Sequence, residues 1–420
     1  MDEEIYEDIV IVGAGISGLT TALGLHRLGL RSLVLESSEC LKFTGYALTT
    51  WPNAWRALDA VGVGDLLRKN SILTQGFKVV SSGSIPLGAE QSHDLLLFNF
   101  ESRCIKRKDL LETLESQLPH GTIRYSSKAV SIEETQTGNF KLLHLADGSL
   151  VKTKVLIGCD GGNSMVAKWL GLDDPVSTGR SAIRGLANYN NPDHGHGFDP
   201  KFHVYSTLCV HFGFVPCDEN SLYWFCNFSP SFHRYNEENQ DPLSMIKFVG
   251  SQLRDAPPNI SNIVERTELH CICYTPLRLK FPWNVLLGRN FVKNNVCVVG
   301  DAFHPMTPAI GQGGGSSLED SIVLARCLGK ALATSNFEQE YDDEYIRVEK
   351  GLRMYVKERR WRILSLLTAA YIVGFVQHSG NKVISFLRKR FLSKNLVKIT
   401  ARMGDFDCGD LSTIPQKMRI

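Results

Sequence analysis

Hydrophobic and polar positions near the start of the chain follow the pattern of an α/β protein. A β-branched run at Ile9–Val12 ends in glycines, a helical pattern covers Ser17–Leu28, and a second apolar run follows at Ser32–Leu35. Short apolar runs fit buried strands, and apolar positions three and four apart fit one face of a helix. The order strand, helix, strand predicts a βαβ unit within about thirty residues.

The same periodicities predict the elements that follow this unit. Helices are expected over Pro52–Leu67, Arg107–Leu118, Ser317–Leu332 and Glu344–Leu367. Strands are expected over Lys128–Ile132, Lys141–Leu145, Val155–Ile157 and Val296–Val299. Together these elements extend the βαβ unit into a Rossmann-like nucleotide-binding fold.

The middle of the chain, from about Ser181 to Thr275, has a different character. It is rich in aromatic residues, asparagine and proline, and it contains strand-like stretches at Cys209–Val215 and Tyr223–Phe228. We interpret it as a mixed β-sheet domain inserted between pieces of the nucleotide-binding fold. The expected fold class is therefore α/β at the start, α+β overall, with helices towards the C-terminus.

Composition and charge exclude several classes of protein. The 420 residues are 43% hydrophobic and 21% charged, which is typical of globular proteins and not of disordered or fibrous ones. The formal net charge of +2 provides no general attraction for nucleic acid, so we expect a small-molecule partner. Eleven cysteines lack the spacing of zinc ligands, and no metal site is expected.

Three further segments bear on location. The acidic start lacks a basic and apolar leader, which favours a cytoplasmic protein over a secreted one. The apolar run Ile363–Val376 is shorter than the roughly 20 residues that span a bilayer, and we expect a packed helix there. From Lys382 to Arg402 there are seven basic residues and no acidic one; this run fits weak contact with an anionic membrane surface, but fits a solvated helix face better.

The first chemical motif is the glycine-rich turn at 13–18, which reads GAGISG. It follows a predicted strand and begins a predicted helix, the context in which Gly13, Gly15 and Gly18 allow a tight turn, approach of a pyrophosphate, and close packing of helix on strand. Glu36 lies 23 residues after Gly13, at the end of the second strand, where its carboxylate can accept hydrogen bonds from ribose hydroxyls. These residues predict an adenosine diphosphate site without distinguishing FAD from NAD.

The second motif lies almost 290 residues later and distinguishes the two. Residues 300–308 read GDAFHPMTP and residues 311–315 read GQGGG, directly after a predicted strand and before a predicted helix. Asp301 can hold a polyol hydroxyl of FAD, and the helix N-terminus can stabilise an anionic reduced flavin. We interpret His304, in the same turn, as a structural residue and not as a catalytic base.

A third motif, CDGGNS at 159–164, follows the predicted strand Val155–Ile157. With these three motifs in this order, the chain resembles the class A flavoprotein monooxygenases of the para-hydroxybenzoate hydroxylase type, and most of all plant enzymes related to salicylate hydroxylase and zeaxanthin epoxidase. The resemblance implies that the third motif serves FAD and transient NAD(P)H, and that Arg107 contacts the flavin cofactor. Ala167 stands where many relatives carry an arginine, with Lys168 as a substitute.

The motifs and the resemblance together give the expected binding residues for tightly bound FAD, with NADPH or NADH as a transient co-substrate. These are Gly13, Ala14, Gly15, Ser17, Gly18, Glu36, Ser37, Gly45, Ala47, Arg107, Val130, Asp160, Gly161, Asp301, Pro308, Gly311, Gly313 and Gly314. The FAD-binding domain is expected over 1–75, 100–180 and 285–335, the substrate-binding β-sheet domain over 76–99 and 181–284, and a C-terminal helical region over 336–420. The oligomer is left open as monomer or dimer.

The resemblance implies a reaction in which NAD(P)H reduces FAD, O₂ forms a flavin C4a-hydroperoxide, and one oxygen atom passes to the substrate. We expect hydroxylation of an aromatic or other electron-rich specialised metabolite. An epoxidase or ring-rearranging enzyme with the same oxidant, and a non-catalytic flavin-binding protein, are the alternatives. The pocket candidates are Pro308, Gly311, His211 and Phe225, from a set of six aromatic-ring residues at 211–225 of which strand alternation sends half towards the flavin.

Overall fold

The computed structural model describes most of the chain. The described residues are 4–81, 92–96, 100–136, 138–189, 195–206, 210–233, 235, 240–288, 290–333, 341–378 and 402–412. Two of the segments that the sequence singled out fall largely outside this set: the basic run after Lys382, apart from Arg402, and much of 76–99.

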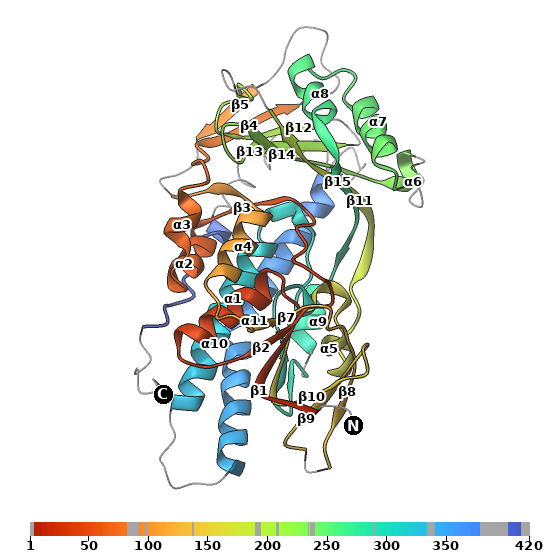
Figure 1. The fold of residues 1–420 in the computed structure, drawn as a ribbon. Helices are drawn as coiled ribbons and strands as arrows, with labels where there is room; N and C mark the ends of the chain where they lie inside the picture. Colours follow the sequence, from red (N-terminus) through yellow and green to blue (C-terminus); the bar gives the residue numbers. More distant parts are fainter. Residues whose placement is uncertain are drawn as a thin grey trace.

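The first sheet has eight strands and a parallel centre (Figure 1). β1 (Glu4–Val12) lies between β10 (Leu150–Gly158) and β2 (Leu33–Leu35) and runs parallel to both. The path continues to β17 (Val296–Val298) and β16 (Val292–Lys293) on one side and to β7 (Ile123–Arg124) on the other, while β9 (Lys141–Leu145) and β8 (Ala129–Glu134) extend from β10. This parallel arrangement confirms the Rossmann-like interpretation.

Helices cover this sheet and supply its hydrophobic core. They are α1 (Ile16–Arg27), α2 (Pro52–Ala60), α3 (Gly64–Arg68), α4 (Arg107–Ser116), α5 (Met165–Trp169), α9 (Pro282–Leu287) and α10 (Gly313–Ala333), with short 3₁₀ turns η1 (Gly161–Asn163), η2 (Gly300–Ala302) and η3 (Pro308–Ile310). The predicted single helix Pro52–Leu67 is wrong: the chain makes α2 and α3, because Gly62 has a φ of +77° and ends the first helix.

The second sheet has seven strands in the order β15-β11-β14-β13-β12-β4-β5. They are β4 (Gly76–Ser81), β5 (Ser92–Leu96), β11 (Val176–Asn188), β12 (Phe202–Ser206), β13 (His211–Pro216), β14 (Ser221–Phe228) and β15 (Thr267–Leu279). All neighbours are antiparallel except β12 and β4, which run parallel. The sheet is mixed, as the sequence predicted. A separate ribbon pairs β3 (Ala47–Thr50) with β6 (Arg103–Lys106).

The two faces of the second sheet have different neighbours. Phe212, Phe214 and Trp224 are buried in a core shared with α7 (Pro242–Gln252) and α8 (Pro258–Glu265), which lie over the sheet in Figure 1; the short α6 (Pro230–His233) lies at one end. Because side chains alternate along a strand, the residues directly before and after these three buried residues point to the opposite face of the sheet, towards the first sheet.

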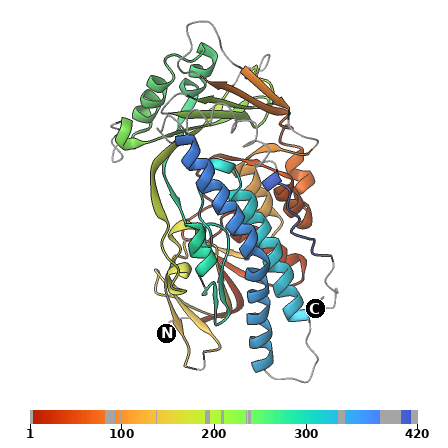
Figure 2. The ribbon, with the colours of Figure 1, turned by 180° about the vertical axis from the view of Figure 1, so that it is seen from behind.

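The long helix α11 (Tyr341–His378) connects the two parts of the molecule. It runs along α10 and continues towards the second sheet (Figure 2), where Arg180 Nη1 on β11 donates to the carbonyl of Gly374 at 3.0 Å. The predicted packed helix at Ile363–Val376 lies within α11. Among the described residues, none of the helices combines the length and apolarity that crossing a membrane requires.

Candidate active site

The glycine-rich turn between β1 and α1 uses its three glycines in two ways. A Cβ on Gly13 would lie 2.6 Å from the carbonyl oxygen of Cys159, and one on Gly18 would lie 1.8 Å from that of Gly13, so both positions are closed to any side chain by packing. A Cβ on Gly15, by contrast, would meet nothing within 4 Å. Gly15 is the N-cap of α1, where unpaired N–H groups attract an anion. The first and third glycines therefore hold the fold together, and the middle one leaves room for a ligand.

Glu36 lies beside this turn, directly after β2. Its Oε2 accepts from the N–H of Ala14 at 2.9 Å, and its Oε1 accepts from the N–H of Ser38 at 2.9 Å. Burial raises the pKa of Glu36, but these backbone hydrogen bonds outweigh it and hold the pKa below its ordinary value. The carboxylate is thus ionised and oriented, with lone pairs left for further donors.

Other residues expected at this end lie around the same turn in different environments. The N–H of Ala14 is already bonded to Glu36, and Ser17 is buried against Gly300, where a Cβ would approach its Oγ to 2.1 Å. Ser37 is exposed and donates to Glu36. Val130 is exposed on β8, three residues after Ser127, whose N–H donates to the Glu36 carbonyl.

The contact between Ser17 and Gly300 brings the two main motifs together. Gly300 has a φ of +63°, and its Cα lies against Ser17 of α1 and Ser317 of α10. Ser321 of α10 also donates to the carbonyl of Ser17 at 3.1 Å. Residues almost 300 positions apart therefore form one continuous cradle, as a dinucleotide that spans both motifs requires.

Asp301 follows Gly300 and is enclosed by protein while it stays open to solvent. Its side chain is solvent-accessible, yet protein encloses it closely enough that burial raises its pKa, against the opposing charges of Arg107 and Arg184. A carboxylate that is enclosed and still reachable is one that lines a cleft. Such a carboxylate could accept hydrogen bonds from a polyol hydroxyl.

The loop after Asp301 ends at the N-terminus of α10. Pro308 begins η3 and is exposed, and Gly311 has a φ of +62°, a conformation that glycine adopts without strain. Gly313 and Gly314 open the 21-residue helix, whose first turn contains no acidic residue. No acidic side chain in this turn therefore offsets the positive end of the helix dipole.

Two arginines converge on Gly45, opposite this loop. A Cβ on Gly45, which has a φ of +90°, would lie 3.6 Å from Nη1 of Arg107 and 3.7 Å from Nη1 of Arg184. Ala47 lies at the start of β3 and its N–H donates to the Gly45 carbonyl. Arg107 was expected from the sequence, whereas Arg184 on β11 was missed, because nothing local to the sequence shows which face of a strand approaches a loop 139 residues earlier.

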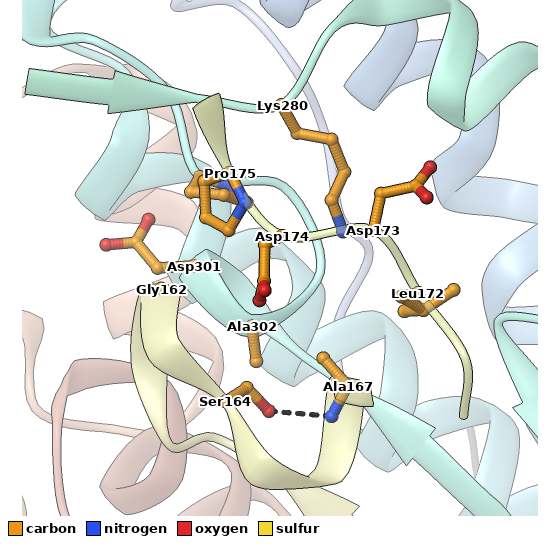
Figure 3. Close-up of a pocket in the computed structure, with 11 residues that line it drawn as sticks. Gly162, Ser164, Ala167, Leu172, Asp173, Asp174, Pro175, Lys280, Asp301 and Ala302 are labelled. Carbon is orange, nitrogen blue, oxygen red and sulfur yellow. Dashed lines mark hydrogen bonds between the residues drawn. The ribbon is translucent and has the colours of Figure 1, made fainter. Parts of the chain in front are cut away.

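The third motif adjoins Asp301 from the side of β10. Asp160 Oδ1 accepts from Ser164 Oγ at 2.5 Å and Oδ2 accepts from the N–H of Met165 at 2.7 Å, so this carboxylate holds the turn that contains Gly161. A small cleft lies beside it, lined by Ser164, Asp301 and other residues including Lys280 (Figure 3). Lys280 is buried, and its Nζ donates to the carbonyl of Phe303 at 3.2 Å.

The face of the second sheet that points towards this cradle carries Arg184, Tyr223 and Phe225. Phe225 pairs with Gly213 across the strands, and a Cβ on Gly213 would lie 2.4 Å from Cζ of its ring, so the tip of the ring occupies the space that a side chain on Gly213 would need. Burial raises the pKa of Tyr223 to about 12, so its phenol stays neutral. His211, the first residue of β13, has the same alternation as Phe225, whereas Phe212, Phe214 and Trp224 face the core under α7 and α8.

A buried ionic network supports the flavin-side loop from behind, and it was not predicted. Arg359 of α11 is fully buried, with Glu319 Oε2 and Asp320 Oδ1 each 2.6 Å from its nitrogens. Asp320 also contacts Nε2 of His304 at 2.5 Å, and Arg362 reaches Glu319 Oε1 at 2.8 Å. His304 is therefore committed to the network that fixes the loop.

The residues of the cradle fit FAD by the polar atoms that they present. The Nε1 of Trp51 and the Nε2 of Gln312 are buried donors without a hydrogen-bond partner in the described protein, as is the Nε of Arg107. Trp51 Nε1 lies 3.6 Å from the Cβ position of Gly311. Buried donors are costly without an acceptor, and a flavin with its carbonyls and ring nitrogens supplies acceptors at this place.

Comparison with known proteins agrees with this geometry. The family model described as FAD binding domain matches residues 6–270 and 273–351. Monooxygenase 2 of Arabidopsis thaliana is 47% identical over 421 residues, covering 98% of this chain and all of the relative, and Monooxygenase 1 of the same plant is 36% identical over 403 residues, covering 96% and 99%. The crystal structure of Klebsiella pneumoniae HpxO in complex with FAD and uric acid has the same fold, with a TM-score of 0.72, 17% identity, and 99% and 98% of the two chains covered.

The matches extend over nearly the whole chain and include both sheets, and they confirm the resemblance that the three motifs indicated. The chain therefore belongs to the FAD-binding domain family and is an FAD-dependent monooxygenase of the class A, para-hydroxybenzoate hydroxylase type.

Proposed function

We propose that this protein uses NAD(P)H and O₂ to hydroxylate an aromatic specialised metabolite that carries an ionisable oxygen, such as a phenol or a carboxylic acid. The observation that carries the substrate class is Arg184. Its guanidinium is half-buried on the cradle-facing side of the second sheet and, within the described part of the chain, no carboxylate lies within 4 Å of it. A partly buried cation whose carboxylate neighbours lie beyond ion-pair distance favours an anionic ligand.

The surroundings of Arg184 support a planar substrate. Phe225 and Tyr223 lie on the same face, and an aromatic row continues from Phe225 to Phe202 at 6.0 Å and from Phe202 to Phe77 at 5.3 Å between ring centroids. Aromatic walls suit a flat ring. The comparison structure of HpxO also holds a planar ring compound, uric acid, together with FAD.

The chain's own residues then have distinct tasks in the proposed reaction. Bound FAD supplies the chemistry that activates O₂ and transfers one oxygen atom. Arg184 holds the ionised oxygen of the substrate and thereby favours the electron-rich form of the ring. Tyr223 stays neutral, so it donates a hydrogen bond without competing for Arg184. Glu36 and Asp301 hold the two halves of the cofactor.

Transient docking of NAD(P)H is part of this proposal. The sequence contains one Gly-x-Gly-x-x-Gly turn directly after a strand, at 13–18, and that turn is assigned to FAD. A second permanent dinucleotide site would need its own turn of this kind. The reductant is therefore expected to bind briefly and to leave after reducing the flavin.

The test is oxygen incorporation under turnover. The purified holoprotein, identified by a flavin absorbance band near about 450 nm, is screened with phenols and aromatic acids for substrate-dependent consumption of NADPH or NADH. In ¹⁸O₂, we expect one labelled oxygen atom in the product. Substrate oxidation without labelled oxygen would contradict a monooxygenase reaction, and equal activity on matched methyl ethers or esters would contradict the role of the ionisable oxygen.

A further inference from the structure

We propose that Cys104 and Cys217 form an oxidation site at which a peroxide joins the two parts of the molecule by a disulfide. Cys104 lies on β6, in the ribbon beside the cofactor cradle, and Cys217 directly follows β13 of the second sheet. Their Sγ atoms are 3.3 Å apart although the residues are 113 positions apart in sequence. Both side chains are almost completely inaccessible to solvent.

The surrounding contacts hold these two segments against each other. Lys106 Nζ, two residues after Cys104, forms an ion pair with Asp218 Oδ2 at 2.5 Å, and Asp218 directly follows Cys217. The carbonyl of Cys217 accepts from the N–H of Ile72, and its own N–H donates to the carbonyl of Ser221 at 2.9 Å. The sulfur atoms need to approach by only about 1 Å to reach the bond length of a disulfide.

The pair adjoins residues that we propose to line the substrate side of the site. Cys104 and Cys217 share a buried cluster with Val215 and Tyr223, and Phe225 packs against it. Tyr223 and Phe225 belong to the face of the sheet that points towards the cradle. Hydrogen peroxide is the product of O₂ activation when oxygen transfer to a substrate fails, so the proposed reaction itself supplies the oxidant class.

The chemistry balances with hydrogen peroxide as the only oxidant. The thiolate of one cysteine attacks a peroxide oxygen, the O–O bond breaks, and a sulfenic acid and water result. The sulfur of the second cysteine then displaces the hydroxyl as water and forms the S–S bond. Two thiols lose two electrons and two protons, and one peroxide becomes two waters. Because burial raises the pKa of Cys104, we expect this reaction to be slow with peroxide added from outside.

The bond would fix the position of the substrate face over the cradle. Arg107, which lies against Gly45, follows Cys104 by three residues. Tyr223 follows Cys217 by six residues, after the turn into β14. A covalent link between the segments would restrict any relative movement of cofactor and substrate side, so the oxidised enzyme should turn over more slowly and recover on reduction.

The test uses the holoprotein treated with hydrogen peroxide, followed by thiol alkylation, unfolding and mass spectrometry of a non-reduced digest. We expect a cross-linked peptide that joins Cys104 to Cys217, two fewer alkylated thiols of the eleven in the chain, and reversal by dithiothreitol. Cys104→Ala and Cys217→Ala should each abolish the cross-link. Two variants are used, one on each segment, in case one of them does not fold. Retention of FAD shows that a variant is folded.

Cys226→Ala provides the matched control. Cys226 is as deeply buried, on the opposite face of β14, and no thiol lies in contact with it among the residues described. This variant should form the Cys104–Cys217 bond as readily as the unmodified protein. Absence of the cross-linked peptide after prolonged treatment that fully oxidises the exposed Cys40 would overturn the proposal, as would a reducible loss of activity that persists in both Cys104→Ala and Cys217→Ala. Because the oxidant is added, these outcomes do not depend on the proposed substrate or reaction.

Discussion

The two ends of the cofactor cradle are built in opposite ways. The adenosine end comes from one short stretch of chain, in which the turn at 13–18 and Glu36 are joined by the hydrogen bond from Ala14. The end that we assign to the flavin is assembled from Gly45, Arg107 and the loop after Gly300, and Arg184 of the second sheet, which we assign to the substrate, reaches the same Gly45. The contrast is that the adenosine end forms within one βαβ unit, whereas the flavin end, most of whose residues the sequence also indicated, is brought together by long-range packing.

The greatest expected effect concerns the ionic network behind the flavin-side loop. Arg359→Met would leave Glu319 and Asp320 as buried carboxylates with too few partners, and we expect it to lower the free energy of unfolding by about 3–5 kcal/mol. Chemical denaturation followed by fluorescence measures this. FAD should be lost at the same time, because α10 and the loop lose their support from α11.

The matched control for that variant is on the same helix. Arg353 pairs with Glu349 one turn away, and its side chain is 59% exposed. Arg353→Ala should change the free energy of unfolding by no more than about 0.5 kcal/mol. Similar losses in the two variants would mean that the buried network contributes nothing particular to the flavin end.

The next effect separates the two uses of glycine at the adenosine end. Gly18→Ala places a methyl group 1.8 Å from a backbone oxygen, and we expect a loss of about 1–3 kcal/mol in the stability of the protein without cofactor. Gly15→Ala meets open space, so this stability should stay within about 0.5 kcal/mol while FAD affinity falls. Denaturation of the apoprotein and FAD titration give the two quantities. If the Gly15→Ala apoprotein lost as much stability as Gly18→Ala, the two glycines would not differ in their roles.

How far the sequence predicted the molecule follows from these residues. Gly13, Gly18 and Glu36 were predictable because strand, turn and helix follow one another along the chain and leave a recognisable spacing. The mixed second sheet was predictable from its alternating aromatic strands. The position of Arg184 and the network around Arg359 were not, because both depend on register and on the docking of α11, which no local pattern records. Gly62 divides the expected helix at Pro52–Leu67. A glycine often marks the end of a helix, but the apolar residues at helical spacing on both sides of Gly62 favoured one continuous helix.

A third effect tests the proposed substrate side of the site through Arg184. Arg184→Met should lower kcat/KM for a phenolic or carboxylic substrate by about tenfold to a hundredfold, the loss of a hydrogen bond to a charged group. FAD should remain bound. Arg180, on the same strand, is the control, since it bonds to the carbonyl of Gly374; Arg180→Met should reduce stability without changing the preference between acids and their esters. An unaltered preference in Arg184→Met would exclude the role proposed for it.

The smallest expected effect is the dependence of stability on pH. Burial raises the pKa values of Glu319 and Asp320, but the charges of Arg359 and, for Asp320, of His304 outweigh it and hold them below their ordinary values. The folded state therefore binds fewer protons than the unfolded one, and its stability is full above the ordinary carboxyl pKa and falls as pH drops through the lowered one. We expect a loss of about 1 kcal/mol between pH 7 and pH 4 from this pair. Arg359→Met should reduce this loss of stability between pH 7 and pH 4. An unchanged loss would mean that other carboxylates cause it.

The most direct test of the two-ended cradle compares the binding of FAD and of ADP by two variants. Calorimetric titration of the apoprotein gives both affinities. Gly15→Ala should weaken FAD and ADP alike, because both contain the pyrophosphate that approaches this turn. Asp301→Ala should weaken FAD while ADP binds as in the unmodified protein. Equal loss of ADP binding in both variants, or unchanged FAD affinity in Asp301→Ala, would contradict the assignment of the two ends.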